Sequence, residues 1–243
     1  MKPDAQVQAA LAPHGRLRVG LNMANFLLIT GTTASGEPDG VSPDIGRKLA
    51  QALGVSVEFI RFDGPGQVAD AVNDDAWDVA NIANEPARAE TIDFSPAYCE
   101  IQASFLVKHD AGLHAFADVD KPGRTIAVKA RSAYELWLSD HLRHAALVRT
   151  ESMEESYGAF VDQELDALAG LRPKLLEYQQ ETAGTQVMQV PFTAVKQSMG
   201  IRRGTPEAAI WLAQFVKEAV VSGVVNDLIE HHGVGGRLSV PPH

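Results

Sequence analysis

The sequence has little of what marks several classes of protein. It contains one cysteine, Cys99, in 243 residues, so no internal disulfide can form and a zinc site built from several cysteines is excluded. The apolar stretch Ala97–Ile101 around it favours a buried, unreactive thiol over a reactive one. No apolar run approaches the ~20 residues of a membrane-spanning helix.

Basic residues are also few. There are 21 Lys and Arg against 31 Asp and Glu, giving a formal net charge of −10. Nucleic-acid binding requires a basic face for the phosphates, so we expect no nucleic-acid partner. An acidic surface favours solubility and does not forbid an anionic ligand, because a few buried basic groups can set the local sign. Nothing in the sequence indicates an oligomer, and we expect a monomer.

The N-terminal segment Met1–Asp4 lacks the charged start, apolar core and cleavage site of a signal peptide. Two interpretations stay open. Either a native signal has been removed and the protein is periplasmic, or the protein remains in the cytoplasm.

Strand and helix patterns alternate in the first part of the chain. Residues 16–22 alternate as a strand does, and 45–53 carries apolar residues on one helix face until Gly54 ends the helix. Residues 55–60 are rich in β-branched side chains and predict the next strand. The order strand, helix, strand indicates a parallel βαβ unit.

The alternation continues to the end of the chain and favours α/β sheets covered by helices on both faces, in which ligands bind beyond the carboxyl ends of the strands. We expect strands at 78–82, 104–108, 125–128, 147–150, 166–170, 187–190 and 195–201. We expect helices at 68–72, from Ser132, at 152–162, around 175–178, at 206–222 and before Gly233.

Five motifs follow one another in a specific order: Gly36–Ile45, Ala52–Phe59, Trp77–Val79, Pro86–Tyr98 and Leu165–Leu168. The fourth, P-A-R-A-E-T-I-D-F-S-P-A-Y, is the most distinctive. Together they resemble the family 3 extracellular solute-binding proteins, the amino-acid-binding type used by ABC importers. The resemblance extends from about Leu17 to His232.

The resemblance implies the type II periplasmic-binding-protein fold, with two α/β lobes joined by two crossing hinge strands. Lobe one would comprise residues 1–103 and 197–243, and lobe two residues 104–196. It also implies a binding protein without catalytic activity or cofactor, which captures a small carboxylate-bearing ligand between the lobes by hinge closure. An ABC transporter permease would be its partner.

Arg88 is the first predicted ligand contact. A guanidinium is planar and always charged, and it can bind both oxygens of a carboxylate at once. The resemblance implies that the arginine of this motif binds the ligand's carboxylate in this way. The alternative is a surface arginine paired with Glu85 or Glu90.

Ser132 is predicted to begin a helix, where free N–H groups and the helix dipole attract an anion. The resemblance implies that this turn holds the same carboxylate, while Ser132 can also be a plain N-cap. The turn reads Ala130-Arg131-Ser132 rather than the family's Gly-Thr-Thr-like sequence, so Arg131 adds positive charge.

Residues after the first strand and after residue 80 are further candidates. The resemblance implies ligand contacts from Asn22, Asn25 and Phe26, although core packing is the alternative for the apolar stretch. Asn84 and its neighbours from Asn81 lie where the family contacts the ligand's amine. Asparagine replaces the usual serine or threonine here, which puts those contacts in doubt.

Leu171 is the most informative departure from the family. In amino-acid binders the corresponding strand commonly ends in an aspartate that pairs with the α-ammonium, but here Leu171 is followed by Arg172. A buried ammonium without a counter-charge is unfavourable. We therefore hypothesise a ligand that is not a simple α-amino acid, with Arg172 or Arg131 as a second anion partner. A solvated Arg172 and an amine held by Glu85 or Glu135 is the alternative.

Two other functions stay open. An enzyme on the same scaffold, of the cyclohexadienyl dehydratase type, needs a poised carboxylic acid, for which Glu85 and Glu135 are the candidates. A metabolite-sensing module could use the same closure of two lobes on a ligand. His141 and His144 are one helical turn apart, but no third ligand is evident, so we predict no metal site.

Overall fold

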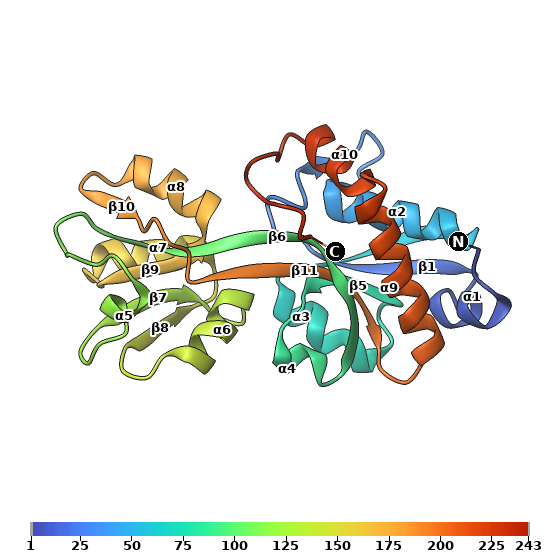
Figure 1. Ribbon diagram of the computed structural model, residues 1–243, viewed down its shortest axis with the longest axis horizontal. Helices are drawn as coiled ribbons and strands as arrows, with labels where there is room; N and C mark the ends of the chain where they lie inside the picture. The colour runs from blue at the N-terminus through green and yellow to red at the C-terminus, as the bar shows by residue number, and fades with distance from the viewer. Residues whose placement is uncertain (1, 243) are drawn as a thin grey trace. The chain divides into compact units, whose positions relative to one another are not determined.

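The computed structural model describes residues 2–242, which form two compact units. Unit 1 comprises the chain up to Glu100 and again from Lys196, and unit 2 comprises Ile101–Val195. The sequence-based boundaries were placed after residue 103 and before residue 197. Two long strands, β6 (Ile92–Lys108) and β11 (Thr193–Arg202), run from one unit into the other (Figure 1).

The sheet of unit 1 begins with the predicted βαβ unit. Strand β1 (Arg16–Asn22) is parallel to both β4 (Ser56–Phe62) and β5 (Val79–Ala83), with Val19 opposite Phe59 and Val79. Strand β11 then pairs antiparallel with β5, and β6 follows it in the strand order β4-β1-β5-β11-β6. All five residues of β5 are buried, which explains why its sequence is apolar without alternation.

Helices cover this sheet on both faces (Figure 1). They are α1 (Ala5–Leu11), α2 (Val41–Leu53), α3 (Pro65–Asp70) with a 3-10 turn at Ala71–Asp74, α4 (Pro86–Ala89), α9 (Pro206–Val221) and α10 (Val224–His231). Gly54 ends α2 in the left-handed conformation, as predicted. The Gly-rich loop contains a small hairpin, β2 (Gly31–Thr32) and β3 (Pro38–Asp39).

Unit 2 repeats the architecture on the strands ordered β6-β9-β7-β8. Its elements are α5 (Phe116–Val119), β7 (Thr125–Lys129), α6 (Ala133–His141), β8 (Ala146–Thr150), α7 (Met153–Asp162), β9 (Ala167–Leu171), α8 (Arg172–Glu181) and β10 (Thr185–Val187). Strand β7 is parallel to β8 and β9, and β6 is antiparallel to β9. Phe160, Leu168 and Leu175 are core residues between the sheet and helices α7 and α8.

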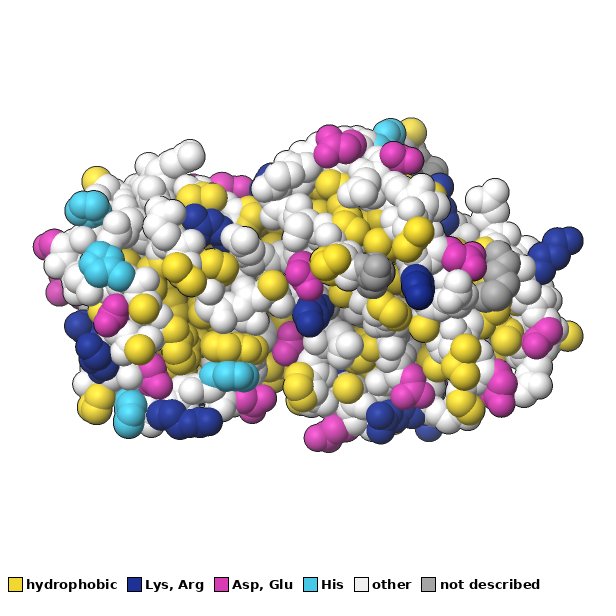
Figure 2. All heavy atoms as spheres, in the orientation of Figure 1, with side chains coloured by type: hydrophobic (Ala, Val, Ile, Leu, Met, Phe, Trp, Pro, Cys, Tyr) yellow, Lys and Arg dark blue, Asp and Glu magenta, His cyan; other side chains and the backbone are white. Residues whose placement is uncertain are grey.

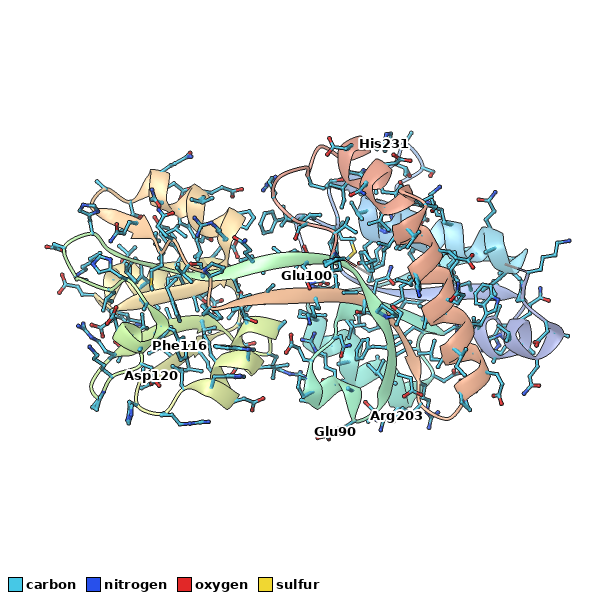
Figure 3. All side chains as sticks on the ribbon, viewed as in Figure 1. Glu90, Glu100, Phe116, Asp120, Arg203 and His231 are labelled. Carbon is cyan, nitrogen blue, oxygen red and sulfur yellow. The ribbon has the colours of Figure 1, made fainter. Side chains whose placement is uncertain are left out.

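Aromatic side chains pack together elsewhere in unit 2. Trp137 on α6 stacks on His141 at 3.8 Å and meets Phe116 edge-on at 5.4 Å, while Phe192 lies 5.3 Å from it. Phe116, labelled in Figure 3, lies on the face where Figure 2 shows apolar side chains gathered on this unit. Phe116, Trp137 and Phe192 remain partly exposed.

Much of the most distinctive motif, Pro86–Tyr98, builds unit 1. Ile92 and Phe94 pack where a Cβ on Gly200 would lie, so β11 requires a glycine at this position. The Ser95 hydroxyl accepts a hydrogen bond from the Met199 amide at 3.1 Å. These contacts tie β6 to β11 within unit 1.

The predicted elements are present with two main differences. The strand expected at 104–108 is the end of the 17-residue strand β6. The strand expected at 187–190 is wrong beyond its first residue, because β10 ends at Val187. Among the described residues no single helix is long and apolar enough to cross a membrane, whereas α9 and α10 would reach that length together but meet at a 65° bend.

Candidate functional site

Arg88 lies just beyond the carboxyl end of β5, in the short helix α4. Its side chain is buried, with the residue 5% exposed, and one guanidinium nitrogen donates to the Ala83 carbonyl at 2.9 Å. This excludes the alternative of a surface arginine. The strand–loop–helix turn therefore places a permanent positive charge inside unit 1 at the edge where α/β sheets bind ligands.

Asn22, Asn25 and Phe26 follow β1, whose carboxyl end lies at the same edge because β1 and β5 are parallel. The Asn22 side-chain oxygen accepts from the Ala24 amide at 3.2 Å, and that of Asn25 accepts from the Leu27 amide at 3.3 Å. Both asparagines therefore shape this loop through local turns. Phe26 is partly exposed.

Leu27 and Leu28, in contrast, belong to the core at 0% and 3% exposure. Core packing, the alternative reading of this stretch, thus holds for those two leucines but not for Phe26.

Asn81 and Asn84 differ in where they point. Asn81 is buried, and its side-chain amide donates to the Ser42 carbonyl at the start of α2, at 2.8 Å. Asn84 is exposed, and its backbone N–H donates to the Lys196 carbonyl at 2.9 Å. Asn84 is therefore the residue of this segment that remains a candidate contact.

In unit 2, Ser132 is the N-cap of α6. Its hydroxyl accepts from the Glu135 amide at 3.2 Å and donates to the Lys129 carbonyl at 2.8 Å. The Glu135 carboxylate in turn accepts from the Arg131 amide at 3.0 Å. The plain N-cap role is thus present, and it orders the turn that precedes the helix.

Arg131 adopts a left-handed backbone with φ +59°, which non-glycine residues rarely occupy. The sequence pattern could not show this conformation. Arg131 is exposed, so the strained turn holds its side chain at the surface of unit 2, next to the start of α6.

Leu171 and Arg172 mark the junction of β9 and α8. Leu171 is the N-cap of α8 and Arg172 its first residue, and the Arg172 guanidinium donates to the Met188 carbonyl at 2.6 Å. No described residue gives Arg172 a carboxylate within 4.0 Å. Because β7 and β9 are parallel, Arg172 and Arg131 follow neighbouring strands at one edge of the unit 2 sheet.

Glu135 is a structural carboxylate. It is 4% exposed, one oxygen accepts from Arg149 Nε at 2.8 Å and from Ser139 at 2.7 Å, and the other accepts from Arg131. The sequence signal was present as the capping box Ser132-Ala-Tyr-Glu135, although its pairing with Arg149 could not be read from spacing. Glu85, the other candidate acid, is buried at 9% exposure.

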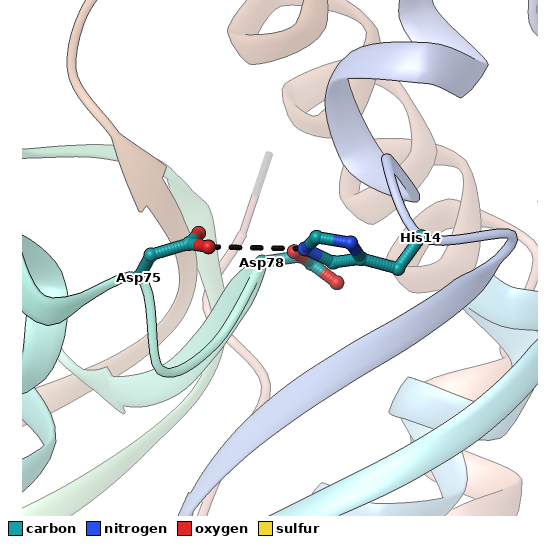
Figure 4. Close-up of side chains that lie close together, drawn as sticks. All are labelled: His14, Asp75 and Asp78. Carbon is teal, nitrogen blue, oxygen red and sulfur yellow. Dashed lines mark ion pairs between the residues drawn. The ribbon is translucent and has the colours of Figure 1, made fainter.

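Two groups of acidic and histidine side chains come close enough to hold a cation in principle: His14 with Asp75 and Asp78, and Asp39 with Asp44 and His232. The first group, shown in Figure 4, contains the His14–Asp75 ion pair at 3.7 Å, and both aspartates also bind Arg18. In the second group Asp44 binds Arg47 and His232. Arg18 thus neutralises both aspartates of the first group, and Arg47 neutralises Asp44 of the second.

Comparison with known proteins gives consistent results. The profile of the "bacterial extracellular solute-binding proteins, family 3" matches residues 17–234. The ABC transporter glutamine-binding protein GlnH of Bacillus subtilis is 23% identical over 200 residues, which cover 81% of this chain and 73% of that protein.

Two solved structures illustrate the likeness in fold. The ancestral amino acid-binding protein AncCDT-1, a precursor of cyclohexadienyl dehydratase, has a TM-score of 0.73 and 25% identity over 93% of this chain and 99% of its own. A solute receptor for L-cysteine of Neisseria gonorrhoeae has a TM-score of 0.77 and 19% identity over 96% and 99% of the two chains.

Proposed function

Because this chain belongs to family 3 of the bacterial extracellular solute-binding proteins, we propose that it captures a small carboxylate-bearing solute and delivers it to an ABC importer without changing it chemically. The family is extracellular, and this supports a location outside the cytoplasmic membrane. The relative in Bacillus subtilis is a component of an ABC transporter, which supports a permease as the partner.

Arg88 is the observation that carries the proposal. Its guanidinium is a permanent charge held at 5% exposure just beyond the carboxyl end of β5, the edge at which such sheets bind ligands. A ligand carboxylate matches a guanidinium through a bidentate pair. The N-terminus of α6 at Ser132 would supply further N–H donors to the same group. The family resemblance implies hinge closure on the ligand, which would exclude water from the ion pair and strengthen it.

The ligand we propose lacks an α-ammonium group. Leu171 stands where the family's amino-acid binders carry an aspartate, and Arg172 follows it. Both oxygens of Glu135 accept hydrogen bonds within unit 2, which removes one of the two acids that could have replaced that aspartate. Hydroxy, keto, aromatic and dicarboxylic acids fit this edge better than standard amino acids.

A thermal-shift screen tests the function and the ligand class together. The panel contains glutamine, arginine, lysine and cysteine beside keto, hydroxy, aromatic and dicarboxylic acids. A ligand at 100 times its Kd should add roughly 2.7 kcal/mol of stability. If only amino acids raise the unfolding temperature, the proposed ligand class without an α-ammonium is wrong. If no acid raises it, the proposed binding function is contradicted.

Arg88→Ala and Arg88→Lys then test the site by calorimetry. Both should abolish or strongly weaken binding, because lysine keeps the charge but loses the bidentate geometry. Arg203→Ala is the matched control, since Arg203 also lies in unit 1 but is exposed and paired with Asp93 at 3.1 Å. Unchanged affinity in folded Arg88→Ala would refute the assignment.

The alternative is a lyase of the dehydratase type, which is raised because AncCDT-1, a binding protein 25% identical to this chain, is a precursor of cyclohexadienyl dehydratase. Incubation with prephenate or arogenate distinguishes the two functions. Formation of phenylpyruvate or phenylalanine would replace the binding function by an enzymatic one.

A further inference from the structure

The segment that follows α10 is attached to unit 1 at three places. It is drawn in red in Figure 1 and runs from α10 back to β6. Figure 3 labels His231 at the end of α10 and Glu100 on β6, which mark the two ends of this path. We call residues 232–239 the C-terminal segment.

The first attachment is His232. Its Nε2 lies 2.8 Å from an Asp44 carboxylate oxygen in the first turn of α2, and its Nδ1 lies 3.4 Å from the Thr30 hydroxyl. The side chain is 4% exposed. Thr30 closes the loop that follows β1, so His232 fixes the far end of the loop that carries Phe26.

The last attachment is Ser239. It forms an antiparallel bridge with Glu100, with N–H···O distances of 2.7 and 2.9 Å in the two directions. Glu100 is the last residue of unit 1 on β6, one of the two strands that run into unit 2. Between the attachments, Val234 and Leu238 are buried at 2% and 9% exposure, so apolar packing anchors the turn of the segment.

The middle contact joins the segment to the predicted ligand loop. The guanidinium carbon of Arg237 lies over the Phe26 ring, 5.4 Å from its centroid. The turn that presents Arg237 is closed by a hydrogen bond from its amide to the Val234 carbonyl at 3.1 Å. Because both flanks of the segment are fixed, the arginine is held against the ring by the fold.

We infer that Arg237 is a positioning residue that fixes the Phe26 ring and thereby tunes the binding site for ligands with a planar apolar group. The inference rests on the proposed function. A cation over one face of an aromatic ring stabilises its orientation, and a ring so held offers its other face for stacking. An aromatic acid that stacks on this face gains affinity, and an aliphatic acid of similar size gains less.

Two measurements on the full chain test this inference. The first is hydrogen exchange of the ligand-free protein, read at the amides of Leu27, Leu28 and Ile29, whose protection comes from hydrogen bonds to Asn25. Arg237→Ala should speed exchange at these amides, Arg237→Lys should do so less, and Arg203→Ala should leave them unchanged.

The second measurement is calorimetry with phenylpyruvate and 4-methyl-2-oxopentanoate, which share a keto-acid head. Arg237→Ala should lower the affinity for phenylpyruvate by roughly threefold to fivefold, the value of an exposed cation–π contact. The affinity for the aliphatic acid should remain nearly unchanged. A purely structural role would weaken both acids equally.

Unchanged exchange at the three amides, or an equal loss for both acids, would overturn the inference. The proposed function fails separately, if folded Arg88→Ala binds as the native protein does or if no acid binds the native protein. In that last case the exchange measurement still decides whether Arg237 positions the loop.

Discussion

Asp78 in unit 1 and Asp166 in unit 2 make closely similar hydrogen bonds. Each immediately precedes a parallel strand and accepts, at 2.8 Å, from the backbone N–H of a residue on the neighbouring strand, Arg18 in one case and Thr125 in the other. Each also binds an arginine, Arg18 or Arg124. The two units thus fix the start of their central strands by one device.

Removal of either carboxylate should destabilise the protein. Asp78→Ala leaves a strand amide without its acceptor and leaves the Arg18 guanidinium, whose side chain is 12% exposed, with the exposed Asp75 as its remaining carboxylate, so we expect a loss of about 3 kcal/mol. Asp166 has 23% of its side chain exposed against 2% for Asp78, so Asp166→Ala should cost about 2 kcal/mol. Urea unfolding monitored by circular dichroism gives both values.

Asp75→Ala is the control for this prediction. Asp75 also binds Arg18 but its side chain is 71% exposed, and surface ion pairs contribute little to stability. Equal losses for Asp75→Ala and Asp78→Ala would show that burial does not determine the contribution.

The Gly36–Ile45 motif requires glycine at position 40 for two structural reasons. The φ of Gly40 is +143°, and a Cβ there would collide with the Leu28 carbonyl oxygen. We expect Gly40→Ala to cost about 2–4 kcal/mol, because both the backbone conformation and the space require glycine. Gly36, with φ +82° and open space around it, is the control and should lose about 1 kcal/mol. A similar midpoint shift for both in thermal unfolding would contradict this explanation.

Acid should weaken the fold through Asp166. Burial raises the pKa of Asp166, but hydrogen bonds from Arg124 and Thr125 lower it by more, so its pKa lies below the ordinary value. A carboxyl whose pKa is depressed in the folded state stabilises the protein above its unfolded pKa of about 4, and that contribution disappears as pH falls through the folded pKa.

Asp166→Asn tests whether stability falls with pH in this direction. The variant should be less stable than the native protein at neutral pH, and the difference should shrink as pH falls below about 4, since asparagine does not titrate. Urea unfolding across this range measures the difference. A gap that stays constant would show that Asp166 does not contribute through its charge.

The sequence was sufficient for those parts of the fold that local patterns determine. The apolar spacing of 45–53, the stop at Gly54 and the N-cap at Ser132 each depend on neighbouring residues, and each was predicted. The length of β6 was not predicted, because Pro96 and polar residues interrupt its pattern. Strands β9 and β10 pair with its residues 103–108, of which 104–108 were predicted, whereas the earlier part depends on its other neighbour, β11, which is distant in sequence.

In the candidate site, too, some features follow from local sequence and others depend on residues that are distant in sequence. Arg88 could be singled out from its motif, but its burial depends on the packing of α4. The roles of Glu135 and Arg237 arise from partners 14 and 211 residues away, Arg149 and Phe26, and no spacing rule connects residues so distant. Arg131 could be recognised as unusual, yet its left-handed backbone could not.

Leu171→Asp should change the class of ligand. The substitution places a carboxylate at the carboxyl end of β9, at the N-cap of α8, where aspartate is a favourable cap and the helix dipole stabilises its charge. The fold should therefore tolerate the change. The new carboxylate offers an α-ammonium the counter-charge it lacks in the native protein, while it repels a second anionic group.

Calorimetry of the native protein and Leu171→Asp with matched pairs of acids measures the effect. Each pair consists of an amino acid and its keto analogue, such as phenylalanine with phenylpyruvate. We expect the ratio of affinities to move toward the amino acid by at least tenfold, which corresponds to about 1.4 kcal/mol. Leu171→Asn, which caps the helix without a charge, is the control and should leave the ratio near that of the native protein. If native protein already prefers the amino acid, an ammonium partner other than residue 171 exists, and Glu85 is the acid to replace next.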